Sequence, residues 1–236
     1  MKISVCMAAY NGENHIEKQI SSILCQLKPD DELIIVDDCS QDETANIIKN
    51  FNDSRIKLLK NKYNSGVVAT FENALSMAKG DIIFISDQDD VWLDNKVSFV
   101  RNFFMSNNVD LIVHDALIEN EGRIISDSLF SRINSSDGIF KNLYSNSYTG
   151  CCMAFKPHIL KKVLPIPLKQ GIFHDAWIGI LSKFYRFKII FITTPLIIYH
   201  RHEANVSSMK RRAIYKIIPD RINLLISLFQ RIVNDK

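Results

Sequence analysis

The chain has 236 residues, 47% of them hydrophobic, which is enough to bury one sizeable core and favours a single domain with at most a short appendage. Its net charge of +3 is unevenly distributed, because residues 209–236 carry +5 and the first 208 residues carry −2. A weakly acidic body lacks the basic face of a nucleic-acid-binding protein, so no nucleic acid is expected as a partner.

The five cysteines are odd in number and form neither a CxxC pair nor the Cys/His spacing of a zinc site. This usage predicts reduced thiols in a cytoplasmic protein. No signal-peptide pattern opens the sequence, and the longest apolar runs fall far short of the roughly 20 residues that cross a bilayer. We therefore expect neither export nor a membrane span.

The first half of the chain alternates β-rich runs with longer helical patterns. The β-rich runs are residues 3–9, 32–36, 56–60 and 81–85, and the helical patterns are residues 13–27, 42–51 and 67–78. Strands that alternate with long helices predict parallel βαβ units with right-handed crossovers. The predicted fold class is therefore α/β, with a Rossmann-like, mostly parallel central sheet and helices on both faces.

Two local signals support this register. Ser40 followed by Glu43 has the spacing of a capping box, which predicts a helix start at this point. Gly80 is expected to close the helix that ends at Ala78.

The second half of the chain is less regular. Residues 127–149 are rich in Ser and Asn without clear periodicity, so we expect a long loop there. The other predicted elements are helices at residues 93–105, 157–163 and 175–185, and strands at residues 110–118, 151–155, 187–192 and 196–199.

Polar clusters follow three of the predicted parallel strands, at residues 10–13, 37–40 and 86–90. Because ligands of open parallel sheets bind outside the carboxyl ends of the strands, these clusters are expected to form one site. Each also has a structural alternative: Asp37 and Asp38 as helix caps, and Tyr10 as a turn or core aromatic residue.

The acidic run Asp87-Gln88-Asp89-Asp90 is the most informative of the three clusters. Its three carboxylates repel one another unless a cation offsets them, and hard divalent cations prefer oxygen ligands. The run therefore predicts Mn²⁺ or Mg²⁺ together with a diphosphate substrate, the alternative being a solvated acidic turn. The chain contains neither a GxxxxGK[ST] loop nor a GxGxxG motif, which excludes P-loop hydrolases and ordinary dinucleotide dehydrogenases.

Together these motifs resemble family 2 glycosyltransferases, whose fold is of the GT-A type. The resemblance spans about residues 3–207. It rests on residues 5–13, 36–42, 64–66, 80–83, 86–92, 149–155, 174–177 and 199–205. Within the family, SDQDDVW combined with a late Tyr-x-x-His-x-x-Asn is similar to bacterial rhamnosyltransferases and related O-antigen and capsule enzymes.

The resemblance implies a set of roles for individual residues. Tyr10 would stack on a pyrimidine base, and Asp38, with Asp37 nearby, would accept the N3 proton of that base. The implied nucleotide-sugar-binding residues are Ala8, Tyr10, Glu13, Asp37, Asp38, Gly66, Asn73, Asp87 and Gln88. The implied metal ligands are Asp87, Asp89 and His202.

The same resemblance makes Asp175 the catalytic base, with His174 as the second candidate. An N-cap is the structural alternative for Asp175. Trp177, Gly150 and Cys151 would contact the acceptor, and for Trp177 a core position is the equal alternative.

The chain is expected to divide into a glycosyltransferase domain, residues 1–208, and a basic amphipathic helical tail, residues 209–236. Within the domain, residues 1–115 would bind the nucleotide sugar, and residues 116–208 would supply the acceptor and catalytic half. In the tail, Ile222, Leu225, Phe229 and Ile232 recur at helical spacing. This stripe predicts either contact with the anionic inner leaflet of a bacterial cytoplasmic membrane or packing on the domain or a dimer partner.

The sequence is thus interpreted as an inverting, metal-dependent transferase that moves a hexose or deoxyhexose, with rhamnose favoured. The donor would be a dTDP- or UDP-sugar, and the acceptor a lipid-linked or growing cell-surface polysaccharide. The alternatives are a UDP-galactose, UDP-glucose or N-acetylhexosamine transferase of the same family, and a non-catalytic nucleotide-sugar-binding module. A nucleotidyltransferase is disfavoured, because residues 7–14 lack a glycine-rich basic loop.

Overall fold

The computed structural model describes residues 1–201 and 214–234, with the side chains of the last helix described from residue 217. The first half contains β1 (Ile3–Ala9), α1 (Ile16–Leu24), β2 (Glu32–Asp37), α2 (Thr44–Asn50), β3 (Ile56–Lys60), α3 (Val67–Met77) and β4 (Ile82–Ser86). The connecting middle part contains β5 (Val91–Trp92), α4 (Lys96–Ser106), β6 (Leu111–Asn120), β7 (Arg123–Ser126), α5 (Leu129–Ile133) and α6 (Ile139–Tyr144). The last part contains η1 (Gly150–Cys152), β8 (Met153–Phe155), η2 (Pro157–Ile159), α7 (Leu160–Val163), α8 (His174–Phe184), β9 (Ile189–Arg201) and α9 (Ile214–Asn234).

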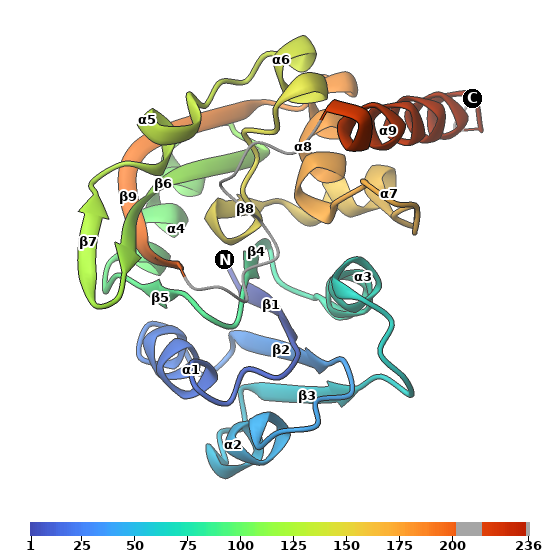
Figure 1. Cartoon of the computed structure of the whole chain (residues 1–236). Coiled ribbons are helices and arrows are strands. Elements are labelled where there is room, and N and C mark those ends of the chain that lie inside the picture. The colour runs from blue at the N-terminus through green and yellow to red at the C-terminus, as the bar shows by residue number, and fades with distance from the viewer. Residues whose placement is uncertain (202–213, 235–236) are drawn as a thin grey trace.

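One curved sheet organises the molecule, in the order β3-β2-β1-β4-β8-β6-β9-β5, with β7 paired to β6 (Figure 1). The four strands of the first half are parallel to one another. Beyond them, β8 runs antiparallel to both β4 and β6, whereas β6 and β9 are parallel. The predicted α/β class is confirmed, and the four strands of the first half form a continuous parallel part of the sheet.

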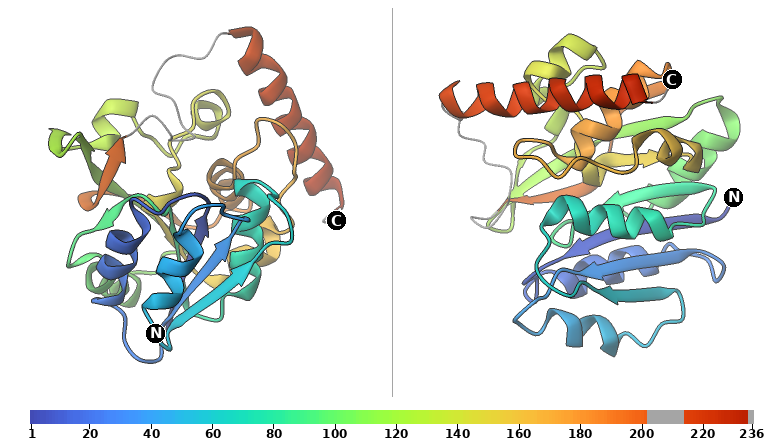
Figure 2. Two further views of the ribbon diagram at one scale, coloured as in Figure 1. Left: turned by 60° about the horizontal axis from the view of Figure 1, so that its bottom comes forward. Right: turned by 90° about the vertical axis from the view of Figure 1, so that its right-hand side faces the viewer.

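Helices cover both faces of the parallel strands. Helices α1 and α3 lie on opposite sides of β1 and β2 (Figures 1 and 2). Strands β1, β2 and β4 are therefore buried almost throughout, which explains their continuous apolar sequences. This packing fixes the carboxyl ends of the three strands at one edge of the core.

Both local signals for helix ends have a different role in the structure. Helix α2 begins at Thr44 without a side-chain cap from Ser40, whose hydroxyl instead accepts the backbone N–H of Asn11 at 3.0 Å. The predicted capping box is therefore wrong, because Ser40 is occupied by the turn after β1. Gly80 does not close α3, which ends at Met77. It allows close packing on β1, since a Cβ atom there would lie 2.5 Å from the backbone nitrogen of Ser4.

Residues 127–149 are not the predicted continuous loop, because they contain the short helices α5 and α6. Buried Asp115 organises the first of these: its carboxylate accepts the backbone N–H of Phe130 at 2.9 Å and the hydroxyl of Ser128 at 2.5 Å. The two β-rich runs predicted near the end of the domain form one strand, β9. Strands β5 and β7 were not predicted.

Helix α9 packs one face on the domain. Leu224 and Leu228 are buried, and Arg231 donates to the carbonyl oxygens of Leu164, at 2.7 Å, and Pro165. Of the alternatives for the tail, packing on the domain is thus observed for this face. None of the helices within the two described ranges has the length and apolar character of a membrane span.

Candidate active site

The site lies at the carboxyl ends of β1, β2 and β4, where the three polar clusters meet. Tyr10, 45% exposed, follows β1 and is joined to Gln88, which follows β4. The Tyr10 backbone N–H donates to Gln88 Oε1, and Gln88 Nε2 donates to the Tyr10 carbonyl, both at 2.9 Å. Gly12 makes room for this clamp, because a Cβ atom there would lie 2.3 Å from Gln88 Oε1. The clamp holds the Tyr10 ring at the rim of the site.

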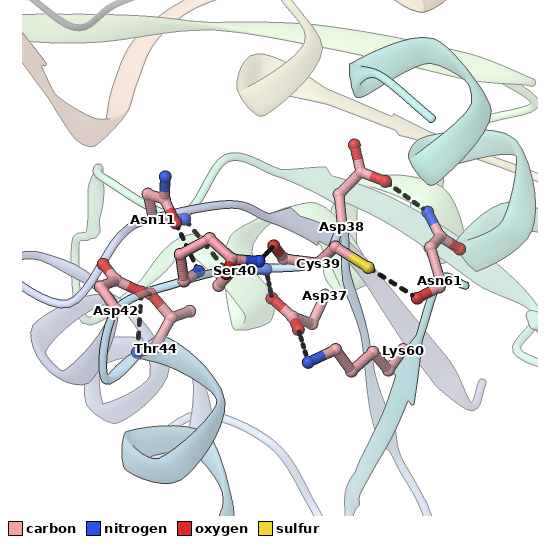
Figure 3. A network of polar contacts seen from close by, with 10 residues as sticks. Asn11, Asp37, Asp38, Cys39, Ser40, Asp42, Thr44, Lys60 and Asn61 are labelled. Atoms are coloured by element: carbon pink, nitrogen blue, oxygen red, sulfur yellow. Dashed lines mark hydrogen bonds and ion pairs between the residues drawn. The ribbon is translucent and has the colours of Figure 1, made fainter. Parts of the chain in front are cut away.

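Asp37 and Asp38 end β2 and are both buried (Figure 3). The Asp38 carboxylate accepts three hydrogen bonds, from Asn61 Nδ2 at 2.7 Å and from the backbone N–H groups of Ser65 and Gly66 at 2.8 Å. Asp38 therefore fixes the turn that leads into α3, and Gly66 occupies that turn with a φ of 83°.

Asp37 instead supports the turn that follows β2, where its carboxylate accepts the Ser40 N–H at 3.2 Å and lies 3.8 Å from Lys60 Nζ at the end of β3. Cys39 follows the two aspartates with a φ of 64°, a left-handed backbone conformation that turns the chain out of β2. The pair thus holds the two turns at this edge of the sheet, and direct base contact by Asp38 stays a prediction.

The other expected donor-site residues lie around the same edge. Glu13 Oε2 accepts the backbone N–H of Glu43 at 3.0 Å, which joins the turn after β1 to the start of α2. Asn73, exposed on α3, donates to Asn61 Oδ1 at 2.9 Å. Ala8 is half-buried on β1. These residues line or support the edge, and their contacts with a nucleotide sugar stay predictions.

An acidic cluster lies directly after β4. Carboxylate oxygens of Asp87 and Asp90 lie within 4.8 Å of each other and of Cys151 Sγ. Burial, followed by the nearby charge of Asp89, raises the pKa of Asp87 to about 7 and also raises the pKa of Asp90. The run bends at residues 88 and 89, and this bend, rather than an extended backbone, brings the first and last aspartates together.

A hard divalent cation fits this cluster. Asp90 Oδ2 is buried and has no hydrogen-bond partner among the described residues, so a cation would satisfy it. The hydrogen bond with Cys152 and burial raise the pKa of the Cys151 thiol well above its usual value, and this thiol is hydrogen-bonded to the carboxylates. Because hard cations prefer oxygen ligands, the carboxylates rather than the thiol are the expected ligands. The predicted ligand Asp89 lies within electrostatic range of both aspartates. The predicted ligand His202 lies outside the described residues.

Asp175 is in the first turn of α8 and faces the acidic cluster, because its charge acts on Asp87. Its carboxylate accepts the backbone N–H of Ala176 at 2.6 Å and that of Gly150. Burial is the dominant effect and raises the pKa of Asp175 to about 6, although these hydrogen bonds lower it. A carboxylate with this pKa suits proton transfer near neutral pH.

The two ring-bearing residues that were predicted to act beside Asp175, His174 and Trp177, are both in the core. Neither ring nitrogen of His174 has a hydrogen-bond partner among the described residues, and its ring lies 4.0 Å from that of Phe71. Burial lowers the pKa of His174 to about 3, so it is neutral. Trp177 is 0% exposed and donates its Nε1–H to the Val163 carbonyl at 2.8 Å. Of the two alternatives for Trp177, the structure therefore has the core position.

The turn η1 joins the acidic cluster to Asp175. Two of the three predicted acceptor residues, Gly150 and Cys151, are buried in it. A Cβ atom at Gly150 would lie 2.7 Å from His174 Nε2, so only glycine fits at this distance from α8. Gly150 and Cys151 therefore hold the acidic cluster and α8 next to each other. Acceptor contact at this turn stays a prediction.

Sequence reasoning missed a buried cation beside the cluster. Lys96, at the start of α4, is 0% exposed, and its Nζ donates to the Cys151 carbonyl at 2.8 Å and lies 4.1 Å from the Trp92 ring centroid. Burial lowers the pKa of Lys96 to about 8, while the neighbouring thiols and carboxylates raise it. The available signal was a lysine six residues after Asp90 at the start of a predicted helix, a pattern that is also typical of a solvated helix end.

Comparisons with known proteins agree with this geometry. Residues 4–164 match the family model described as Glycosyl transferase family 2. Over 180 residues, the chain is 30% identical to the Escherichia coli UDP-Glc:alpha-D-GlcNAc-diphosphoundecaprenol beta-1,3-glucosyltransferase WfgD. That alignment covers 76% of this chain and 70% of the relative. The chain spans 70% of the length of this relative and 38% of that of another, the Bacillus subtilis putative glycosyltransferase EpsE.

Solved structures with the same fold include S. aureus TarS 1-349 in complex with UDP-GlcNAc. The TM-score is 0.72 at 20% identity, with 92% of this chain and 64% of that chain covered. The mannosyltransferase PcManGT from Pyrobaculum calidifontis, in complex with GDP-Man and Mn²⁺, has a TM-score of 0.63 at 18% identity, with 99% and 64% covered. These likenesses confirm the GT-A type of fold that the motifs predicted.

Proposed function

Because the chain belongs to glycosyl transferase family 2, we propose that it is an inverting, metal-dependent glycosyltransferase that acts on a nucleoside-diphosphate sugar. The transferred group is a hexose or deoxyhexose, and the acceptor is a lipid-linked or growing cell-surface polysaccharide. The observation that carries the proposal is the acidic cluster after β4 facing the single carboxylate of Asp175 across η1.

The donor half of the site is formed by the strand ends. The exposed face of Tyr10 is available to stack on the base, and Asp38 and Gly66 shape the turn that surrounds the base. Asp87, Asp89 and Asp90 would hold a divalent cation next to the diphosphate. When bound, Mn²⁺ or Mg²⁺ supplies charge stabilisation on the leaving nucleoside diphosphate.

Asp175 acts as the base. Hydrogen bonds from Ala176 and Gly150 hold its carboxylate in one orientation, and its ionised form takes the proton of the acceptor hydroxyl. The acceptor oxygen attacks the anomeric carbon as the bond to the diphosphate breaks. One base without a second nucleophile implies a single displacement, so the product has the inverted anomeric configuration.

Two donor types are supported. The SDQDDVW motif resembles that of rhamnosyltransferases, which favours a dTDP-deoxyhexose. The names of the relatives favour a UDP-hexose, since WfgD is named for UDP-Glc and the TarS complex contains UDP-GlcNAc. Both uracil and thymine offer an N3 proton to Asp38, so the base contact alone permits either.

A donor screen tests the proposal. The protein is incubated with Mn²⁺ or Mg²⁺ and a panel of dTDP- and UDP-sugars, and release of free nucleoside diphosphate is measured. We expect release from one donor class, abolished by a chelator and strongly reduced in Asp175→Asn when an acceptor is present. Retained anomeric configuration of the product, measured by NMR, would overturn the mechanism.

A further inference from the structure

Helix α9 carries a continuous apolar stripe on the face that points away from the domain. Its members are between 46% and 69% exposed: Ile218, Ile222, Leu225, Ile226, Phe229 and Val233. At about 100° per residue, these positions fall on one side of the helix. Monomeric proteins rarely leave so many large apolar side chains together in water, so the stripe indicates a docking surface.

The opposite side of the helix is already occupied. Leu224, Ser227 and Leu228 are buried against the domain, and the Arg231 guanidinium lies 5.8 Å from the ring centroid of Trp177. Asn223 Nδ2 also donates to the Gln170 carbonyl at 3.2 Å. The helix is therefore held by one face, and its apolar stripe is fixed in an outward direction before any partner binds.

Other exposed apolar residues lie near the stripe. Helix α6 is at the same end of the molecule as α9 (Figures 1 and 2), and its Phe140 and Tyr144 are 88% and 78% exposed. Leu168, 70% exposed, precedes the Lys169 and Gln170 contacts with α9. This end of the molecule thus carries apolar side chains from three separate segments.

We infer that the α9 stripe docks the enzyme on an anionic membrane surface. The charge of the tail selects this occupant: residues 209–236 contain seven basic and two acidic residues. One residue of each sign faces the domain, Arg231 and Asp220, so the remaining excess is still basic. A helix with an apolar face and basic flanks binds at the lipid headgroup boundary, where anionic lipids attract the basic side chains. Two copies joined through this stripe would bring two segments of charge +5 together, which opposes association.

The docking face is linked to the catalytic helix. Arg231 contacts Trp177, which is on α8, and the same helix begins with His174 and Asp175. Membrane contact through α9 would therefore set the orientation of the base relative to the bilayer. This part of the inference rests on the proposed function, since a fixed orientation matters for an acceptor that is anchored in lipid.

Vesicle sedimentation tests the inference with the full chain. The probes are vesicles of phosphatidylcholine alone and of phosphatidylcholine mixed with phosphatidylglycerol. We expect binding only to the anionic vesicles, weakened by salt, and weakened at least roughly tenfold in the double variant Ile222→Ser/Phe229→Ser, which removes apolar contact area. The control variant Met105→Ser removes an exposed apolar side chain on α4, 68% exposed, and should leave binding unchanged.

Three results would overturn the inference: unchanged binding in the double variant, equal binding to both kinds of vesicle, and a wild-type dimer that the double variant converts to a monomer without any vesicle binding. The thermal unfolding midpoint of the double variant should equal that of the wild type, because both residues face outward. Donor hydrolysis in solution, without vesicles, should also be unchanged. Loss of vesicle binding with intact hydrolysis in the double variant supports the inference, whereas absence of hydrolysis in the wild type counts against the proposed function alone.

Discussion

Replacing Asp175 by Asn should make the protein more stable and almost inactive. Burial raises the pKa of Asp175 from 3.8 to about 6. This difference corresponds to about 3 kcal/mol by which the fold disfavours the ionised carboxylate. Asn keeps the oxygen that accepts the Ala176 N–H but carries no charge, so the variant should avoid that free-energy penalty.

The sign of the effect depends on pH. Below about pH 4, Asp175 is protonated in the folded and unfolded chains alike, so Asp175→Asn should leave the free energy of unfolding almost unchanged. Between about pH 4 and pH 6, the unfolded chain releases its proton while the folded chain retains it, so the wild type loses stability as pH rises. Above about pH 6 the variant should be more stable by up to about 3 kcal/mol.

Urea unfolding with a chelator present, at about pH 4 and about pH 7.5, measures this difference. Asp30→Asn is the matched control, because Asp30 is exposed before β2 and away from the site. Turnover of Asp175→Asn should fall by roughly 10² to 10⁴-fold, while donor and metal affinity persist. A variant that is less stable at the higher pH, or that retains near-normal turnover, would refute the reasoning.

Three further outcomes are expected. Mn²⁺ affinity, measured by calorimetry, should rise as pH increases through about 7, because burial raises the pKa of Asp87 and the ion binds the deprotonated cluster; an affinity independent of pH would contradict this. Asp89→Ala should abolish metal-dependent donor binding and nearly all transfer while circular dichroism shows an intact fold, and unchanged calorimetric affinity for donor plus Mn²⁺ would remove Asp89 from the ligand set. Tyr10→Ala should weaken binding of the free nucleoside diphosphate, since base stacking does not depend on the sugar, and an effect confined to the acceptor would contradict the stacking role.

The parallel half of the fold was predictable because its signals are local. Strands β1, β2 and β4 are buried on both faces, so each is a continuous apolar run, and each ends in the polar residues that form the site. The right-handed crossover rule then predicts the face of the sheet on which each connecting helix lies. The placement of the acidic cluster at the sheet edge could therefore be deduced before its geometry was known.

The second half depends on contacts between distant residues, and sequence periodicity does not report these. Helices α5 and α6 have five and six residues, too few to show a helical period. The start of α5 is set by the buried Asp115, whose carboxylate accepts the backbone N–H of Phe130. Periodicity did predict the tail helix and three members of its outward stripe, Ile222, Leu225 and Phe229, whereas the fourth predicted member, Ile232, is not among the exposed residues. It could not distinguish the face that packs on Trp177 from the outward face, because both contain apolar residues at helical spacing.

The three-residue turn η1 explains why the two halves of the site act together. The Cys151 thiol is a hydrogen-bond donor to the acidic cluster, the Cys151 carbonyl accepts from Lys96, and the Gly150 N–H binds the Asp175 carboxylate. A shift of this turn would therefore move the Asp175 carboxylate and alter the charge around the cluster at the same time. The backbone of η1 packs so closely on His174 that no side chain fits at Gly150, and this close packing restricts the position of the turn. The backbone of η1 thus fixes the position of the acidic cluster relative to Asp175, whereas the side chains on either side supply the charges.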